Sequence, residues 1–100
     1  MNIKTNELGN LIFEKKNKVQ YTFYKNPSFF GSGLVIGGIA IPDSEESNGY
    51  RNYGLHLPMC ENLQKFLEEN IPSEIVQQAF DFLIEMVESK MSSEYAIANA

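Results

Sequence analysis

The first half of the chain alternates apolar and polar residues in short runs. This period of two is typical of half-buried β-strands, in which successive side chains point to opposite faces of a sheet. A polar segment at residues 15–18 (Lys-Lys-Asn-Lys) separates two such runs and predicts a β-hairpin with a basic tip. The alternating apolar positions are Leu11, Phe13, Val19, Tyr21 and Phe23.

Further strands are predicted between residues 33 and 57. Residues 33–41 (GLVIGGIAI) are rich in β-branched side chains and are the best candidate for a central strand. The glycine pair Gly37-Gly38 predicts a bulge or a bend over a neighbouring strand. Pro27 predicts a break in the second strand, because proline donates no backbone hydrogen bond. Residues 53–57 follow a polar loop and predict a fourth, short strand.

The second half of the chain changes to the helical period. Pro58 suits the first turn of a helix, and the apolar residues after it recur at helical spacing up to Asn70. Pro72 ends this helix, and Ser73 can cap the next one. The apolar positions of the first predicted helix are Met59, Leu63, Phe66 and Leu67.

Residues 74–90 have the strongest helical pattern in the chain. One side is broadly apolar, and we expect it to pack on the sheet. The opposite side carries a row of polar residues, here called the acidic ridge. The side chains expected to pack are Val76, Phe80, Leu83 and Val87. The acidic ridge consists of Glu74, Gln78, Asp81, Glu85 and Glu88.

Strands followed by helices indicate an α+β fold. We expect a single domain over residues 1–100, with an antiparallel sheet of about four strands in residues 1–57. Two C-terminal helices in residues 58–91 would cover one face of that sheet, and residues 92–100 would extend the last helix or fray. The uncovered face of the sheet would present Gln20, Thr22 and Tyr24.

Charge divides the chain into two unlike halves. Residues 1–42 hold five lysines and two glutamates, a net charge of +3. Residues 43–100 hold three basic and eleven acidic residues, a net charge of −8, so the chain carries −5 in all. Charge patches select partners and set encounter rates. The acidic half therefore favours a protein partner with a basic surface, and the net negative charge opposes direct binding to nucleic acid.

The acidic ridge is the sharpest candidate for a binding surface. It has no basic residue at i±4 to neutralise its carboxylates, and like charges at that spacing cost a few tenths of a kcal/mol each. A solvated helix face is the plainer interpretation. The loop at residues 43–46 could extend this surface if it folds toward the ridge. Separately, Phe29 and Phe30 fall in a predicted loop, where they either tuck under the sheet or form an exposed anchor for a partner, since aromatic side chains dominate binding hot spots. The candidate partner-binding residues are Asp43, Glu45, Glu46, Glu74, Asp81, Glu85, Glu88, Phe29 and Phe30.

Cys60 and His56 are the only candidate pair of nucleophile and base. A thiol near a helix N-terminus ionises more readily, and a neighbouring imidazole could complete a thiol enzyme. No glycine-rich oxyanion loop or orienting carboxylate accompanies the pair, so packing is the favoured interpretation of Cys60.

Other functional classes have little support in the sequence. The glycines at residues 31–38 match no phosphate-binding motif, and one His and one Cys do not make a closed metal site. We therefore expect no cofactor and no metal. The longest nearly apolar run has ten residues, too short to span a bilayer, and the single cysteine allows no intrachain disulfide. A cytoplasmic location, in the producing cell or in a host cell, is the simplest setting.

The preferred hypothesis is a small non-enzymatic inhibitor that occupies a basic surface of its target. Immunity proteins against nuclease toxins and phage-encoded inhibitors of bacterial defence nucleases are the natural classes for such a chain. The alternative is a homo-oligomeric structural or accessory protein, in which a homodimer buries residues 33–41 or the apolar side of the last helix. A thiol enzyme is the least supported hypothesis.

Overall fold

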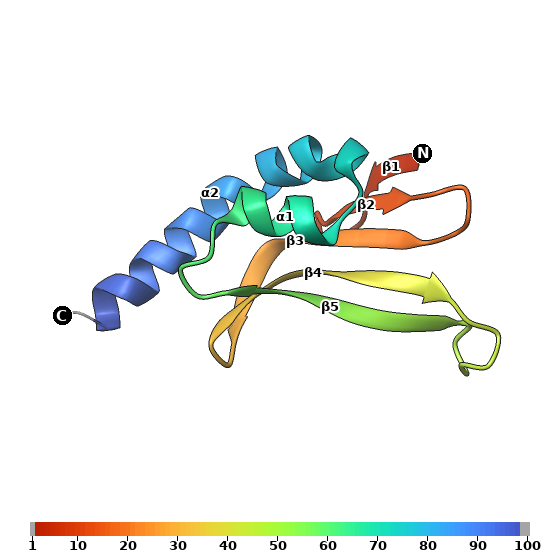
Figure 1. The fold of residues 1–100 in the computed structure, drawn as a ribbon, viewed down its shortest axis with the longest axis horizontal. Coiled ribbons are helices and arrows are strands. Elements are labelled where there is room, and N and C mark those ends of the chain that lie inside the picture. Colours follow the sequence, from red (N-terminus) through yellow and green to blue (C-terminus); the bar gives the residue numbers. More distant parts are fainter. Residues whose placement is uncertain (1, 99–100) are drawn as a thin grey trace.

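The protein is a five-stranded antiparallel sheet followed by two helices (Figure 1). The computed structural model describes residues 2–98, and the side chains of residues 2–92. The strands lie in the sheet in chain order, each paired with the next. The elements are β1 (Asn2–Thr5), β2 (Leu11–Glu14), β3 (Gln20–Phe30), β4 (Gly33–Pro42), β5 (Tyr50–Pro58), α1 (Leu63–Asn70) and α2 (Ser73–Ala98). The α+β prediction is confirmed, with β1 as one strand more than expected.

Both helices lie on the same face of the sheet, and the other face is free of helices (Figure 1). The core forms between that covered face and the helices. Within it, the rings of Phe13 and Phe23 pack edge to face, with their centroids 5.8 Å apart. No polar or charged side chain among the described residues is buried. The buried core residues are Phe13, Phe23, Leu34, Ile36, Leu55, Leu57, Leu63, Leu67, Ile71, Ile75, Ala79, Leu83 and Val87.

Strand β4 contains a bulge next to its glycine pair, as the sequence predicts. Val35 pairs with His56 of β5, and Gly37 pairs with Leu55, so Ile36 has no partner and is an extra residue. A bulge shifts the alternation of side chains by one position, so both halves of the strand keep their apolar residues on the same face. Gly37 lies so close to β3 that a Cβ there would clash with the carbonyl oxygen of Thr22.

Strand β3 passes through Pro27, so the prediction of a strand break there is wrong. Its pairing with β4 shifts between Phe23 and Ser28, and residues 24–27 bulge opposite Ile36. A bulge tolerates proline, because the extra residues make no ladder hydrogen bonds. Pro27 is buried, and the backbone N–H of Lys25 donates to the side chain of Asn10 at 3.0 Å.

The boundary between β5 and α1 also differs from the prediction. Pro58 is the last residue of β5, where its missing N–H is tolerated, and not the first turn of a helix. The helix begins at Leu63, because the side chain of Asn62 caps it by accepting a hydrogen bond from the N–H of Lys65 at 2.9 Å. The fourth predicted strand at residues 53–57 is the longer β5.

Helix α2 faces the core through a row of residues four apart, namely Ile75, Ala79, Leu83 and Val87. Leu83 and Val87 were expected there, whereas Val76 and Phe80 lie beside this row and are only partly buried. The helix continues to Ala98, beyond the predicted end near residue 90, and residues 99–100 lie outside the described part. Within residues 2–98, no helix is long and apolar enough to cross a membrane.

Two glycine substitutions, one at a crowded position and one at an open position, test the close contact between β3 and β4. We expect Gly37→Ala to lower the free energy of unfolding by about 1–3 kcal/mol, because its methyl group would strike the backbone of Thr22. Gly54→Ala is the matched control, since no atom lies within 4 Å of the added carbon. Urea unfolding of both variants measures the difference, and equal stability would show that β3 and β4 do not approach this closely.

The register of α2 is tested by truncating its central core residue. Leu83→Ala removes a fully buried side chain and should cost about 2–5 kcal/mol, enough to unfold much of so small a domain. Phe80→Ala should cost less than a fully buried phenylalanine would, because Phe80 is only partly buried. Leu8→Ala is the control, since Leu8 is 76% exposed. Thermal melting compares the three, and a larger loss for Phe80→Ala than for Leu83→Ala would overturn this register.

Candidate partner-binding surface

The acidic charge of the protein belongs to its helical layer. Residues 61–92 contain seven acidic residues and two lysines, a net charge of −5. Residues 2–58, which form the sheet and its loops, contain five acidic and six basic residues, a net charge of +1. The helices cover one face of the sheet (Figure 1), so this difference separates the two sides of the molecule. The helical side is the one suited to a basic partner.

Every member of the acidic ridge is exposed, but the ridge is not uniform. The carboxylate of Glu74 lies 4.0 Å from Nζ of Lys15 at the β2–β3 turn. Asp81 accepts a hydrogen bond from the side chain of Gln77 at 2.8 Å. Asp81, Glu85 and Glu88 form no salt bridge with any described residue, and we call these three the acidic face.

The second predicted acidic segment lies elsewhere in the molecule. Asp43, Glu45 and Glu46 belong to the turn between β4 and β5, which lies away from the whole of α2 (Figure 1). Asp43 is bound by Arg51 at 2.7 Å and also accepts a hydrogen bond from the N–H of Glu45. This turn therefore does not extend the acidic face.

Phe29 and Phe30 lie at the end of β3 and not in a loop. A two-residue turn with Gly31 at φ 61° joins them to β4, as is typical of a type II′ hairpin. Phe29 is 41% and Phe30 72% exposed. The ring of Phe30 packs edge to face on the ring of His56, with the two ring centroids 6.3 Å apart. The hairpin tip is thus a separate apolar patch, away from the turn that holds Asp43.

The structure does not bring Cys60 and His56 together as a catalytic pair. His56 lies on β5 against Phe30, and a Cβ at Gly33 would be 2.7 Å from its Nε2. Cys60 is exposed in the turn before α1, with φ at 67°. It lines a groove of about 280 Å³ between this turn and α2, together with Glu61, Gln64, Phe80, Ile84 and Glu88. Glu88 connects this groove to the acidic face.

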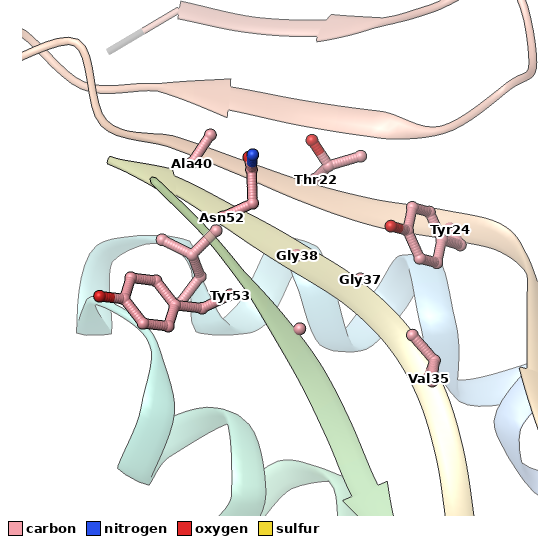
Figure 2. A pocket seen from close by; sticks show the side chains of 10 residues that line it. Thr22, Tyr24, Val35, Gly37, Gly38, Ala40, Asn52 and Tyr53 are labelled. Carbon is pink, nitrogen blue, oxygen red and sulfur yellow. The ribbon is translucent and has the colours of Figure 1, made fainter. Parts of the chain in front are cut away.

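A second hollow lies on the sheet face that has no helices, and it was not predicted from the sequence. It measures about 350 Å³, and Gly37 and Gly38 form its floor between Thr22, Tyr24 and Val35 (Figure 2). It reaches β5 at Gly54, which has no side chain to fill it. The hollow arises because Gly38 of β4 pairs with Gly54 of β5, so that two residues without side chains lie next to each other. The sequence contains both glycines, but only the strand register shows that they are paired.

One ionisable group at the β2–β3 hairpin is perturbed by its surroundings. Burial raises the pKa of Tyr21, because the interior disfavours the phenolate, and the nearby carboxylate of Glu74 raises it further. The N-terminal turn of α2 is thus electrostatically coupled to the hairpin through Glu74, which also lies next to Lys15.

Comparison with known proteins gives no family for this chain, since no protein-family model, curated protein or solved structure matches it. Among the described residues, no three His, Cys, Asp or Glu side chains form a group that could hold a metal ion. The surface properties above are therefore the observations from which its function is inferred.

The coupling between Glu74 and Tyr21 predicts a pH effect of defined sign. The folded state holds the phenol proton of Tyr21 more tightly than the unfolded state does. This stabilisation is complete below about pH 10 and is lost as the pH rises through the raised pKa of the folded state. We expect Glu74→Gln to lower the pKa of Tyr21, because the repelling carboxylate is gone. NMR titration of labelled tyrosine measures it, with Glu88→Gln as the matched control. An unmoved Tyr21 midpoint in Glu74→Gln would contradict the coupling.

Proposed function

We propose that this chain is a non-enzymatic interaction protein that inhibits its target by covering a basic, nucleic-acid-binding surface. The observation that carries the proposal is the acidic face, three exposed carboxylates in a row on α2 that form no salt bridge with any described residue. These side chains recur about every 5 Å along the helix, at spacings where like charges repel. Stability alone does not favour such a row, whereas a basic partner would neutralise it.

The mechanism is steric and electrostatic. Carboxylates of the acidic face take positions that nucleic-acid phosphates would occupy in a cleft lined with Lys and Arg. Charge of one sign on one side of the molecule orients it during encounter, so association is fast and sensitive to salt. The sheet side carries almost no net charge and contributes little to this steering.

The proposed target is cytoplasmic, in the producing cell for an immunity protein or in a host cell for a phage inhibitor. The single, exposed Cys60 suits a reducing compartment, because an exposed thiol in an oxidising one would form disulfides between molecules. Immunity proteins and inhibitors of defence nucleases remain the classes that this surface fits best.

Charge reversal on the acidic face, compared with charge reversal outside the helical layer, tests this function. Partners captured from producing cells are first screened for release by a short DNA duplex, which selects proteins held through a nucleic-acid-binding surface. Asp81→Lys, Glu85→Lys and Glu88→Lys together should slow association with the selected partner by about tenfold or more and weaken its salt dependence. Folding should be retained, since exposed substitutions change stability by about 0.5 kcal/mol or less each.

The matched control reverses three acidic residues outside the helical layer. Glu7→Lys, Glu45→Lys and Glu46→Lys change the net charge by the same amount, and all three positions are exposed. Surface plasmon resonance at low and high salt compares both variants with the native chain. Equal association rates for the two triple variants would mean that net charge and not the acidic face governs binding, and the proposed function would be abandoned.

A further inference from the structure

Strand β5 is an open edge of the sheet, and its one proline, Pro58, is its last residue. Within the described residues it pairs with β4 alone, and Figure 1 shows no element beyond it. It is nine residues long, and Arg51 is its only Asp, Glu, Lys or Arg residue. The other edge, β1, has only four residues and includes Lys4, two features that discourage pairing. An open row of backbone N–H and C=O groups is complementary to another extended strand.

We propose that β5 pairs antiparallel with β5 of a second copy, about a twofold axis through Asn52. This inference does not rest on the acidic face or on the proposed function. Antiparallel pairing of a strand with itself is an isologous contact, so one edge supplies both halves of the interface. The result is a continuous ten-stranded sheet, with five strands from each copy.

The alternation of side chains limits the register of this pairing. Residues directly opposite each other in an antiparallel pair point to the same face of the sheet. In β5 the odd-numbered Leu55 and Leu57 face the core, so odd residues must lie opposite odd residues, and the axis must pass through a residue. An axis through Arg51 would set two guanidinium groups against each other, which is unfavourable.

The axis through Asn52 brings together two favourable pairs of residues. It places Arg51 of each copy opposite Tyr53 of the other, and a cation beside a 48% exposed aromatic ring is a favourable pair. It also places Tyr50 opposite Gly54, on the face that has no helices. Gly54 borders the hollow over Gly38 (Figure 2). The ring of Tyr50 from the second copy would therefore fill space beside Gly54 that no side chain of the first copy occupies. An aromatic side chain across from a strand glycine is a known stabilising arrangement.

The charge and the helices of each copy are compatible with this contact. Arg51 is already bound to Asp43 in its own chain, so the strand brings little net charge to the interface. The half of β5 that begins at Tyr50 extends beyond α1 (Figure 1), so pairing centred on Asn52 does not require the helices of the two copies to overlap.

The oligomeric state of the full chain tests the proposal directly. We expect light scattering over about 1–100 µM to show a species of twice the 11.3 kDa chain mass. Asn52→Lys places two lysines across the axis and should weaken the dimer about tenfold or more. Gln20→Lys is the matched control, because Gln20 lies in the same cross-strand row but two strands from the edge. A monomer at all concentrations, or a dimer equally weakened by both variants, would overturn the proposal.

Cysteine cross-linking tests the register, in a Cys60→Ser background. Asn52→Cys should form a disulfide between copies under mild oxidation, because residues on the axis face each other within the reach of a disulfide. Gly54→Cys is the control: its two thiols would be four residues out of register, and the added side chain meets no atom within 4 Å in its own chain. Cross-linking of Gly54→Cys as efficient as that of Asn52→Cys would overturn the axis through Asn52.

Discussion

The extra residue at Ile36 determines which side chains of β4 reach the core. The apolar residues of this strand are at positions 34 and 36 and then at 39 and 41, so their period of two is interrupted once. In a regular strand the second pair would point away from the helices, because a shift of one residue exchanges the faces of every later side chain. The bulge restores them to the covered face, where Leu34 and Ile36 are buried and Ile39 packs against the core.

The bulge in β4 and the bend in β3 are two parts of one feature. Residues 24–27 of β3 lie opposite Ile36, and Pro27 is buried within that bend. The strands stay close immediately before it, where Gly37 presses on the backbone of Thr22. On the face without helices, the same glycine pair leaves the hollow beneath Tyr24. The core on one face and the hollow on the other therefore have a common origin in the backbone of β4.

The α+β arrangement and most of the helical core followed from side-chain periodicity, because burial on one face imposes it directly. The errors came from prolines interpreted locally. Local preferences of proline predict a strand break at Pro27 and a helix start at Pro58, whereas Pro27 occupies a bulge and Pro58 ends the edge strand β5. Those positions depend on which neighbour a strand has, which is tertiary information. β1 was missed because four exposed residues carry almost no alternation.

The sequence predicted the part of the candidate binding surface that lies on a single helix, but not the part that depends on contacts between different elements. The azimuths of Asp81, Glu85 and Glu88 follow from helix geometry, and all three are exposed as expected. The pairing of Glu74 with Lys15, and the distance of the 43–46 turn from α2, depend on contacts between elements that the sequence pattern does not encode. The open edge of β5 likewise becomes visible only once the order of strands is known.

The acidic face and the edge of β5 occupy different parts of the molecule, and this separation has a consequence for both proposals. A twofold axis perpendicular to the sheet leaves the helices of both copies on the same side. A dimer through β5 would therefore present two acidic faces in one direction, and β5, which contains no acidic residue, would hold the copies together without using a carboxylate. Two linked faces bind an extended basic surface more tightly than one, because the second contact forms within a complex that already exists. Dimerisation through the sheet and inhibition through the helices are thus mutually reinforcing, although neither requires the other.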